Sequence, residues 1–335
     1  MTIPVQRFDL TLGDWVAYPV QRATRPTAFP SPTSLRPSHS FDENCPFCPG
    51  HESEVPDLID QELDPASGQW LVRVSSNKYP ALVPGAPGER NGFGSLFTET
   101  GGRGVHEVVV ESPDHSRSLA EQPLEQVLRV LKVLRRRAEA LSLDPALETV
   151  QIFKNHGQRA GSSLPHPHMQ IIAASVVPRH IRTKISMAAE HYHKRGRSLY
   201  EDIRLAELED GSRIIMKNSE FVAFAPFASR TPYEVWILPT KNAPTFAQSD
   251  PDALPELAEI MKSVLYRLHA ALGDPPFNLT FNGAPRRHAD EPDFVWHIQL
   301  LPRVSALAGF ELATGMAINP ILPEAAAQKL RSIED

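Results

Sequence analysis

The segment NHGQRAGSSLPHPHMQ, from Asn155 to Gln170, is the part of the sequence that most strongly indicates a fold and a site. It combines glycines, adjacent serines, two alternating histidines and a glutamine, and the apolar run Ile171–Ala173 follows it. Side chains alternate between the two faces of a strand, so His166, His168 and Gln170 are expected on one face. Glycines allow close backbone approach, while hydroxyls and backbone N–H groups bind anions. The segment therefore predicts a phosphate-binding loop that leads into an active-site strand.

The same order of features occurs twice along the chain, which indicates a duplicated domain. A strand-like stretch opens at Asn77 and again at Asn218. HEVVVESPDH at 106–115 and HPHMQIIA at 166–173 have counterparts in YEVWILP at 233–239 and WHIQLLP at 296–302. ETVQIFKNHGQ at 148–158 likewise corresponds to FNLTFNGAP at 277–285. Segments 105–111 and 233–238 are typical of strands, and 124–141 and 254–272 have the spacing of amphipathic helices.

These patterns predict an α+β fold of two similar domains, each a mostly antiparallel sheet with a helix packed on it. The expected domains are residues 1–185, which contain the histidine pair, and residues 186–335. The charged stretch 186–204 is predicted to be a linker helix. Residues 1–40 and 80–103 are rich in Pro, Gly and Ser, and are therefore predicted to be loops or arms.

Composition narrows the classes of partner. The chain has 34 basic and 40 acidic residues, a net charge of -6, so nucleic acid and membrane surfaces are not expected partners. The sequence contains no apolar run of about 18 residues, and its N-terminus is not a basic stretch followed by an apolar one. These two observations predict a cytoplasmic protein. The two cysteines, Cys45 and Cys48, form a CxxC pair. In a reducing compartment such a pair is typical of a metal site or a redox pair.

Residues 155–170 resemble the active-site stretch of galactose-1-phosphate uridylyltransferases, a family of the histidine-triad superfamily. The resemblance continues in family order over most of the chain. Its other motifs are Arg22-Ala-Thr-Arg25-Pro26, Cys45-Pro-Phe-Cys48, Val72-Arg-Val-Ser-Ser-Asn77, Ser112-Pro-Asp-His115-Ser116 and Gly-Phe-Glu-Leu at 309–312. The expected domains are accordingly histidine-triad-like.

The resemblance implies a ping-pong reaction in which His168 is the nucleophile. His168 would attack the α-phosphorus of UDP-glucose, release glucose 1-phosphate, and carry the uridylyl group until galactose 1-phosphate accepts it. The backbone carbonyl of His166 would fix the tautomer of His168, and Gln170 would donate to a phosphate oxygen.

Further site residues follow from the same resemblance, together with a homodimer. The implied nucleotide-binding residues are Arg22, Arg25, Asn77, Asn155, Gly161, Ser162, Ser163 and Gln170. The implied sugar-binding residues are Glu311 and Asn319. The implied ligands of one structural zinc ion per subunit are Cys45, Cys48, His115 and His166. Some family members hold a second metal with a carboxylate and three histidines. This chain has Asn282 and Gln299 at two of those histidine positions, so no second metal is expected.

Two alternatives stay open. A phosphorylase of ADP-sugars or dinucleoside polyphosphates would use the same histidine with inorganic phosphate as acceptor. A nucleotide-binding or scaffold protein without turnover would keep the fold, although the intact His166-Pro-His168-x-Gln170 motif favours an enzyme.

Overall fold

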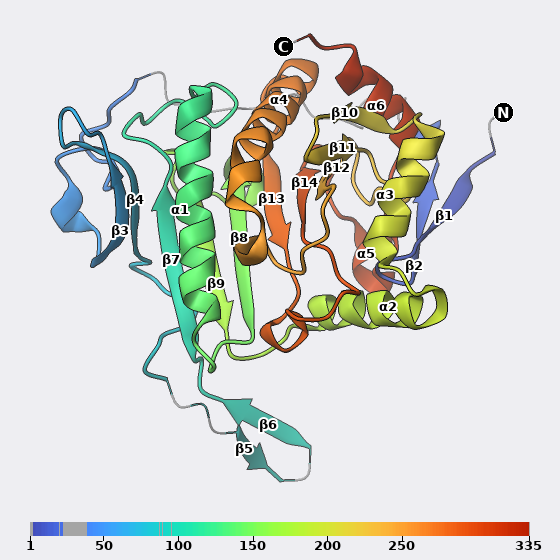
Figure 1. The fold of residues 1–335 in the computed structure, drawn as a ribbon, viewed down its shortest axis with the longest axis horizontal. Helices are drawn as coiled ribbons and strands as arrows, with labels where there is room; N and C mark the ends of the chain where they lie inside the picture. Colours follow the sequence, from blue (N-terminus) through green and yellow to red (C-terminus); the bar gives the residue numbers. More distant parts are fainter. Residues whose placement is uncertain are drawn as a thin grey trace.

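The computed structural model describes residues 3–19, 21–22, 39–86, 88, 90–94 and 96–334. Its main element is a ten-stranded sheet in the order β10-β11-β12-β14-β13-β8-β9-β7-β4-β3, in which every neighbouring pair is antiparallel (Figure 1). The strands are β3 (Leu58–Leu63), β4 (Trp70–Ser76), β7 (Gly104–Val110), β8 (Thr149–His156), β9 (His168–Ala174), β10 (Ile214–Lys217), β11 (Phe221–Phe224), β12 (Val235–Pro239), β13 (Phe277–Asn282) and β14 (His297–Pro302). The predicted α+β class and antiparallel sheet are confirmed.

The two halves of the chain form adjacent halves of this sheet. Strands β3, β4, β7, β9 and β8 come from the first half, and β13, β14, β12, β11 and β10 from the second. They meet where β8 pairs with β13, with Asn155 opposite Asn278. The division into domains at residues 185 and 186 stays a prediction, since one sheet runs through both halves and residue 185 lies inside a helix.

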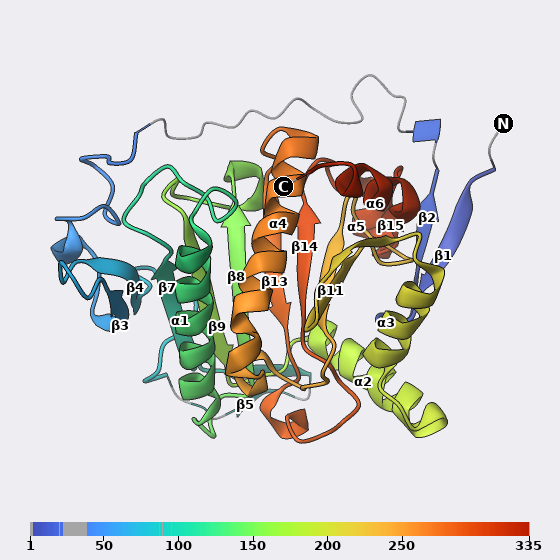
Figure 2. The same ribbon diagram turned by 45° about the horizontal axis from the view of Figure 1, so that its top comes forward.

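Two long helices lie side by side on one face of the sheet, as Figures 1 and 2 show. These are α1 (Leu124–Ser142) and α4 (Leu254–Leu272), at the positions predicted for amphipathic helices. Their buried stripes pack on both halves of the sheet in the main hydrophobic core. Each fully buried Val or Leu in such a stripe contributes about 1.5–3 kcal/mol.

The opposite face of the second half-sheet is covered by α2 (Arg179–Arg195) and α3 (Leu199–Asp210). Ile185, Ala188 and Tyr200 from these helices form a second core with residues of β11 and β12. The single linker helix predicted over 186–204 is therefore wrong. Gly196, which adopts a φ of 70°, ends α2 and separates it from α3, because a left-handed residue cannot continue a helix.

Smaller elements surround the sheet. A three-stranded sheet contains β1 (Val5–Asp9), β2 (Asp14–Tyr18) and β15 (Ala317–Ile318), and β5 (Arg90–Phe93) pairs with β6 (Phe97–Thr100). The hairpins β1–β2 and β5–β6 lie in segments predicted to be loops or arms, and the prediction of loops is wrong there. The last helices are α5 (Gly309–Thr314) and α6 (Pro323–Arg331).

None of the helices in the described part of the chain is both long and apolar enough to cross a membrane.

Candidate active site

His168 lies at the start of β9, on the sheet face that α1 does not cover. Met169, Ile171 and Ala173 belong to the main core under the helices. Because side chains alternate along a strand, His168 and Gln170 project from the other face. His166 precedes the strand, which begins at His168, so the prediction that it shares the strand face is wrong. Its side chain turns instead toward the two cysteines.

The imidazole of His168 is held in one tautomer. Its Nδ1–H donates to the carbonyl oxygen of His166 at 2.8 Å, which leaves the lone pair on Nε2. The residue is 7% exposed. Burial lowers the pKa of His168 below its ordinary value, so the ring is neutral at neutral pH. A neutral imidazole with a free Nε2 lone pair is the form that can act as a nucleophile.

A buried ion pair lies next to this histidine. Lys154 Nζ donates to Glu111 Oε1 at 2.5 Å, and the two side chains are 2% and 1% exposed. Lys154 Nζ also lies 3.4 Å from the carbonyl oxygen of His168. Two charges removed from water are stable only when paired, so this pair fixes β8 against the end of β7 beside the nucleophile.

Cys45, Cys48, His115 and His166 form a buried group whose ligand atoms all lie within 4.8 Å of one another. His166 Nδ1 lies 3.6 Å from Cys45 Sγ and 3.7 Å from Cys48 Sγ, and His115 Nδ1 lies 3.4 Å from Cys48 Sγ. Tetrahedral bonds of about 2.0–2.3 Å to a common ion place neighbouring ligand atoms about 3.3–3.8 Å apart. The group therefore has the geometry of a metal site.

Hydrogen bonds around this group prepare its atoms for a cation. His166 Nε2–H donates to the carbonyl oxygen of Ser112 at 2.9 Å, which leaves Nδ1 free to face the thiols. Backbone N–H groups of Phe47 and Asp42 point at the sulfurs of Cys45 and Cys48. Burial raises the pKa of the Cys45 thiol to about 11, and a bound cation would be needed to hold it as a thiolate at neutral pH.

The glycine-rich loop ahead of His168 is positioned partly by the second half of the chain. Asn278 Nδ2 donates to Asn155 Oδ1 at 2.9 Å and to the carbonyl oxygen of Ala160 at 2.8 Å. Gly157 adopts a φ of 79°, and a Cβ there would approach Pro276 to 3.0 Å. This is why the position takes glycine: it combines a left-handed backbone with close contact to the other half.

The other predicted nucleotide-binding residues include three from this loop and two arginines from the N-terminal segment. Gly161 has a left-handed φ of 92°, Ser162 Oγ donates to the carbonyl oxygen of Leu164, and Ser163 is exposed. Arg22 is exposed and follows β2 in the chain, whereas Arg25 lies outside the described residues. Their roles in binding stay predictions.

Gln170 lies beside two further polar side chains, those of Asn77 and His106. His106 Nε2 lies 2.8 Å from Gln170 Oε1 and 3.1 Å from Asn77 Nδ2. The sequence predicted Asn77 and Gln170 but missed His106. The missed signal was the antiparallel pairing of β7 with β9, which places His106 opposite Ile172, diagonal to Gln170 and on the same face.

Glu311 and Asn319, the predicted sugar-binding residues, bond to their own surroundings. Glu311 Oε2 accepts from the backbone N–H of Ala308 at 2.9 Å at the start of α5. Asn319 is fully buried and donates to the carbonyl oxygens of Ser229 and Thr231. Both side chains have a structural role in this chain, and sugar binding by them stays a prediction.

The second half-sheet has a histidine and a glutamine at positions equivalent to His168 and Gln170. His297 Nδ1–H donates to the carbonyl oxygen of Val295 at 3.0 Å, the same two-residue contact. Lys184 of α2 donates to Asn282 Oδ1 at 2.7 Å and lies 3.4 Å from Gln299 Oε1. These two amides stand where a second metal would require histidines, and an ammonium group faces them. The absence of a second metal stays a prediction.

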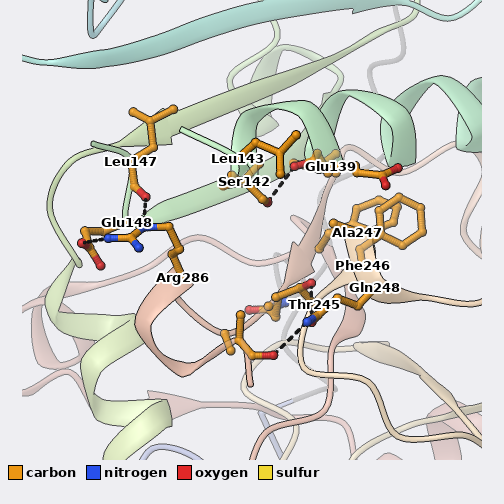
Figure 3. A pocket seen from close by; sticks show the side chains of 18 residues that line it. Glu139, Ser142, Leu143, Leu147, Glu148, Thr245, Phe246, Ala247, Gln248 and Arg286 are labelled. Carbon is orange, nitrogen blue, oxygen red and sulfur yellow. Dashed lines mark hydrogen bonds and ion pairs between the residues drawn. The ribbon is translucent and has the colours of Figure 1, made fainter. Parts of the chain in front are cut away.

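A cavity of about 290 Å³ lies at the other end of β8, on the face that α1 covers (Figure 3). Its walls come from the C-terminal end of α1, the segment 245–248 and the end of β13, and Glu148 forms an ion pair with Arg286 at its edge. None of the predicted site residues lines it, so it is separate from the group around His168.

The fold and site together define a class: a duplicated antiparallel α+β protein whose first half presents a tautomer-fixed histidine beside a glycine-rich loop and a Cys₂His₂ group. The sequence-family model of the galactose-1-phosphate uridyl transferase N-terminal domain matches residues 2–178. A second family model, of a domain of unknown function (DUF4921), matches residues 133–333. The chain belongs to the galactose-1-phosphate uridylyltransferase family.

Individual relatives cover nearly the whole chain. It is 32% identical to the ADP-glucose phosphorylase of Arabidopsis thaliana over 98% of this chain and 93% of that protein. It is 30% identical to the galactose-1-phosphate uridylyltransferase of Thermotoga maritima, over 90% of this chain and 93% of that protein. A crystal structure of an ADP-glucose phosphorylase from Arabidopsis thaliana with bound ADP-glucose matches with a TM-score of 0.85, 30% identity and 99% coverage of both chains.

Proposed function

We propose that the chain transfers a nucleoside monophosphate from a nucleotide sugar to a second phosphate through a covalent bond to His168 Nε2. The observation that carries this proposal is the His168 imidazole, whose Nδ1–H is committed to the His166 carbonyl oxygen while Nε2 keeps its lone pair. Nε2 attacks the α-phosphorus, the bond from that phosphorus to the bridging oxygen breaks, and sugar 1-phosphate leaves. An oxygen of the acceptor phosphate then attacks the same phosphorus and releases Nε2.

The leading assignment is uridylyl transfer from UDP-glucose to galactose 1-phosphate. Membership of the galactose-1-phosphate uridylyltransferase family and the Thermotoga maritima relative support it. In this assignment Gln170 donates to a non-bridging oxygen of the transferring phosphate, and Asn77, Asn155, Gly161, Ser162, Ser163, Arg22 and Arg25 bind the nucleotide. A homodimer in the cytoplasm is part of the same proposal.

A second candidate is phosphorolysis of an ADP-sugar, in which inorganic phosphate replaces the sugar 1-phosphate acceptor. The Arabidopsis thaliana ADP-glucose phosphorylase, which is 32% identical to this chain and aligns over 98% of it, favours this candidate.

We assign zinc to the group of Cys45, Cys48, His115 and His166. Two thiolates and two imidazoles at tetrahedral spacing suit Zn²⁺, and a closed set of four protein ligands is typical of a structural site. Since His166 provides both a ligand nitrogen and the carbonyl oxygen that fixes His168, the ion would hold the nucleophile in place without contacting phosphate.

Intact mass spectrometry tests the reaction. The purified protein is incubated with UDP-glucose or with ADP-glucose, and its mass is compared with that of untreated protein and of the His168→Ala variant. An added uridylyl group, removed by galactose 1-phosphate, supports uridylyl transfer. An added adenylyl group, removed by inorganic phosphate, supports the phosphorylase. If zinc-loaded protein forms neither adduct, the covalent mechanism is refuted.

A further inference from the structure

His106 occupies a position between the predicted catalytic residue Gln170 and the segment 77–81. It lies on β7 opposite Ile172, so its side chain shares with those of His168 and Gln170 the sheet face that α1 does not cover. The backbone N–H of Asn77 also donates to the carbonyl oxygen of His106, which ties the two segments together. The segment 77–81 is thus fixed to β7 next to the His106 ring.

The tautomer of His106 follows from a backbone donor. The N–H of Ala81 points at His106 Nδ1 at 3.1 Å. A backbone N–H can only donate, so Nδ1 must carry a lone pair and the ring proton must be on Nε2. His106 Nε2–H then donates to Gln170 Oε1 at 2.8 Å.

This arrangement fixes the direction of two side-chain amides. Gln170 turns its oxygen to His106, which leaves its NH₂ group free to donate elsewhere. Asn77 Oδ1 accepts from the backbone N–H of Tyr79 at 2.8 Å, so its NH₂ group faces His106 Nε2 at 3.1 Å. Both of those nitrogens carry protons, so the contact is no hydrogen bond. In the described part of the chain, the NH₂ groups of Asn77 and Gln170 have no acceptor, as expected at an anion site.

We propose that His106 is a positioning residue that turns the NH₂ group of Gln170 toward the transferring phosphate. The inference rests on the proposed function, because that function identifies the phosphate as the acceptor of this NH₂ group. A donor aimed in advance at developing charge lowers the barrier without reorganisation during the reaction. Without the His106 N–H, the Gln170 amide can rotate and present its oxygen to the phosphate, which repels it.

A double-mutant cycle tests this coupling. His106→Leu removes the N–H, His106→Gln replaces it with an amide N–H, and Gln170→Ala removes the group acted upon. The rate of His168 nucleotidylylation is measured in single turnovers over a range of nucleotide-sugar concentrations. We expect Gln170→Ala to lower the maximal rate about 100-fold and His106→Leu about 10-fold, with little change in half-saturating concentration. His106→Gln should recover most of the rate, and the double variant should be no slower than Gln170→Ala alone.

Losses that multiply in the double variant, or a His106→Gln protein as slow as His106→Leu, would overturn the proposal. A second measurement needs no turnover: ¹⁵N NMR of the nucleotide-free protein should show the His106 proton on Nε2, with the signal assigned from its loss in His106→Gln. A proton on Nδ1 would also overturn the proposal. If the wild type forms no adduct with either nucleotide sugar, the proposed function fails, and the tautomer still decides the arrangement of His106.

Discussion

The two halves of the sheet carry the same pair of side chains in different surroundings. His168 and Gln170 in β9 correspond to His297 and Gln299 in β14, and both histidines donate Nδ1–H to the carbonyl oxygen two residues earlier. His168 lies on the sheet face that α1 does not cover and is 7% exposed, while His297 is fully buried against Tyr200 and Trp236, with ring centroids 4.7 and 5.0 Å away. The local strand geometry is therefore insufficient for a site. Its greater exposure, the glycine-rich loop and the nearby Cys₂His₂ group distinguish His168, a candidate nucleophile, from His297, a core residue.

The largest expected effect comes from removing each histidine in turn. His168→Ala should lower nucleotidylyl transfer by at least about 10⁴-fold, since the bond-forming atom is lost. His297→Ala should still form the adduct, but should lose about 2–4 kcal/mol of unfolding free energy through the cavity it leaves. Intact mass spectrometry and urea unfolding measure the two effects. An adduct on His168→Ala, or none on folded His297→Ala, would break the comparison.

The metal group sharpens the comparison, since Val295 stands in the second half where the first has His166. His166→Val should remove the bound metal ion and lower the transfer rate about 10- to 100-fold, because the ion then no longer holds the backbone carbonyl of residue 166 in place against His168. Metal content by plasma mass spectrometry and the transfer rate provide the readout. Val295→Ala is the matched control and should keep both the metal content and the transfer rate of the wild type. Full metal occupancy in His166→Val would show that His166 is not a ligand.

The ion pair beside His168 is a further difference, because the strand register places Phe281 of the second half at the position of Lys154. Glu111→Leu should lower the unfolding free energy by about 3–5 kcal/mol, since it leaves a buried ammonium group unpaired. Adding Lys154→Met should restore most of that loss, because two apolar side chains can replace a buried pair. Urea titrations of the single and double variants measure the unfolding free energy. A double variant less stable than Glu111→Leu would argue against this account.

The smallest effect concerns Lys184, the buried lysine of the second half. Burial lowers its pKa to about 8, with Asp9, Glu234 and Arg230 as the charged groups around it. The unfolded chain then binds this proton more tightly than the folded chain, so the unfolding free energy should rise with pH above about 8. Relative to Lys184→Met, the wild type should gain about 2 kcal/mol between roughly pH 8 and pH 10. Parallel pH dependences of the two proteins would contradict the lowered pKa.

The sequence was informative where a function depends on residues close together along the chain. The alternation of His168 and Gln170 and the Cys45–Cys48 pair carry their geometry in their spacing, and the structure brings the cysteines to His115 and His166. The two long helices were predicted to within a residue or two, because their apolar spacing persists over 19 residues in each.

Features that depend on pairing between distant segments were missed. His106 reaches Gln170 only through the register of β7 and β9, which a single sequence does not specify. The hairpin of β1 and β2 was missed because the stretch around it is rich in Pro, which indicates loops. The break at Gly196 was missed because the charged residues on both sides favour a helix, and a left-handed glycine decides the boundary.

The contact of Asn278 with the glycine-rich loop has an evolutionary consequence. After a duplication, the copy without a nucleophile is usually free to diverge or be lost. Here that copy supplies the amide that holds Asn155 and Ala160, and the proline against which Gly157 packs. A gene encoding the first half alone would therefore specify a nucleophile with an unsupported phosphate loop. The duplication is in this sense irreversible, and selection on catalysis acts on both copies.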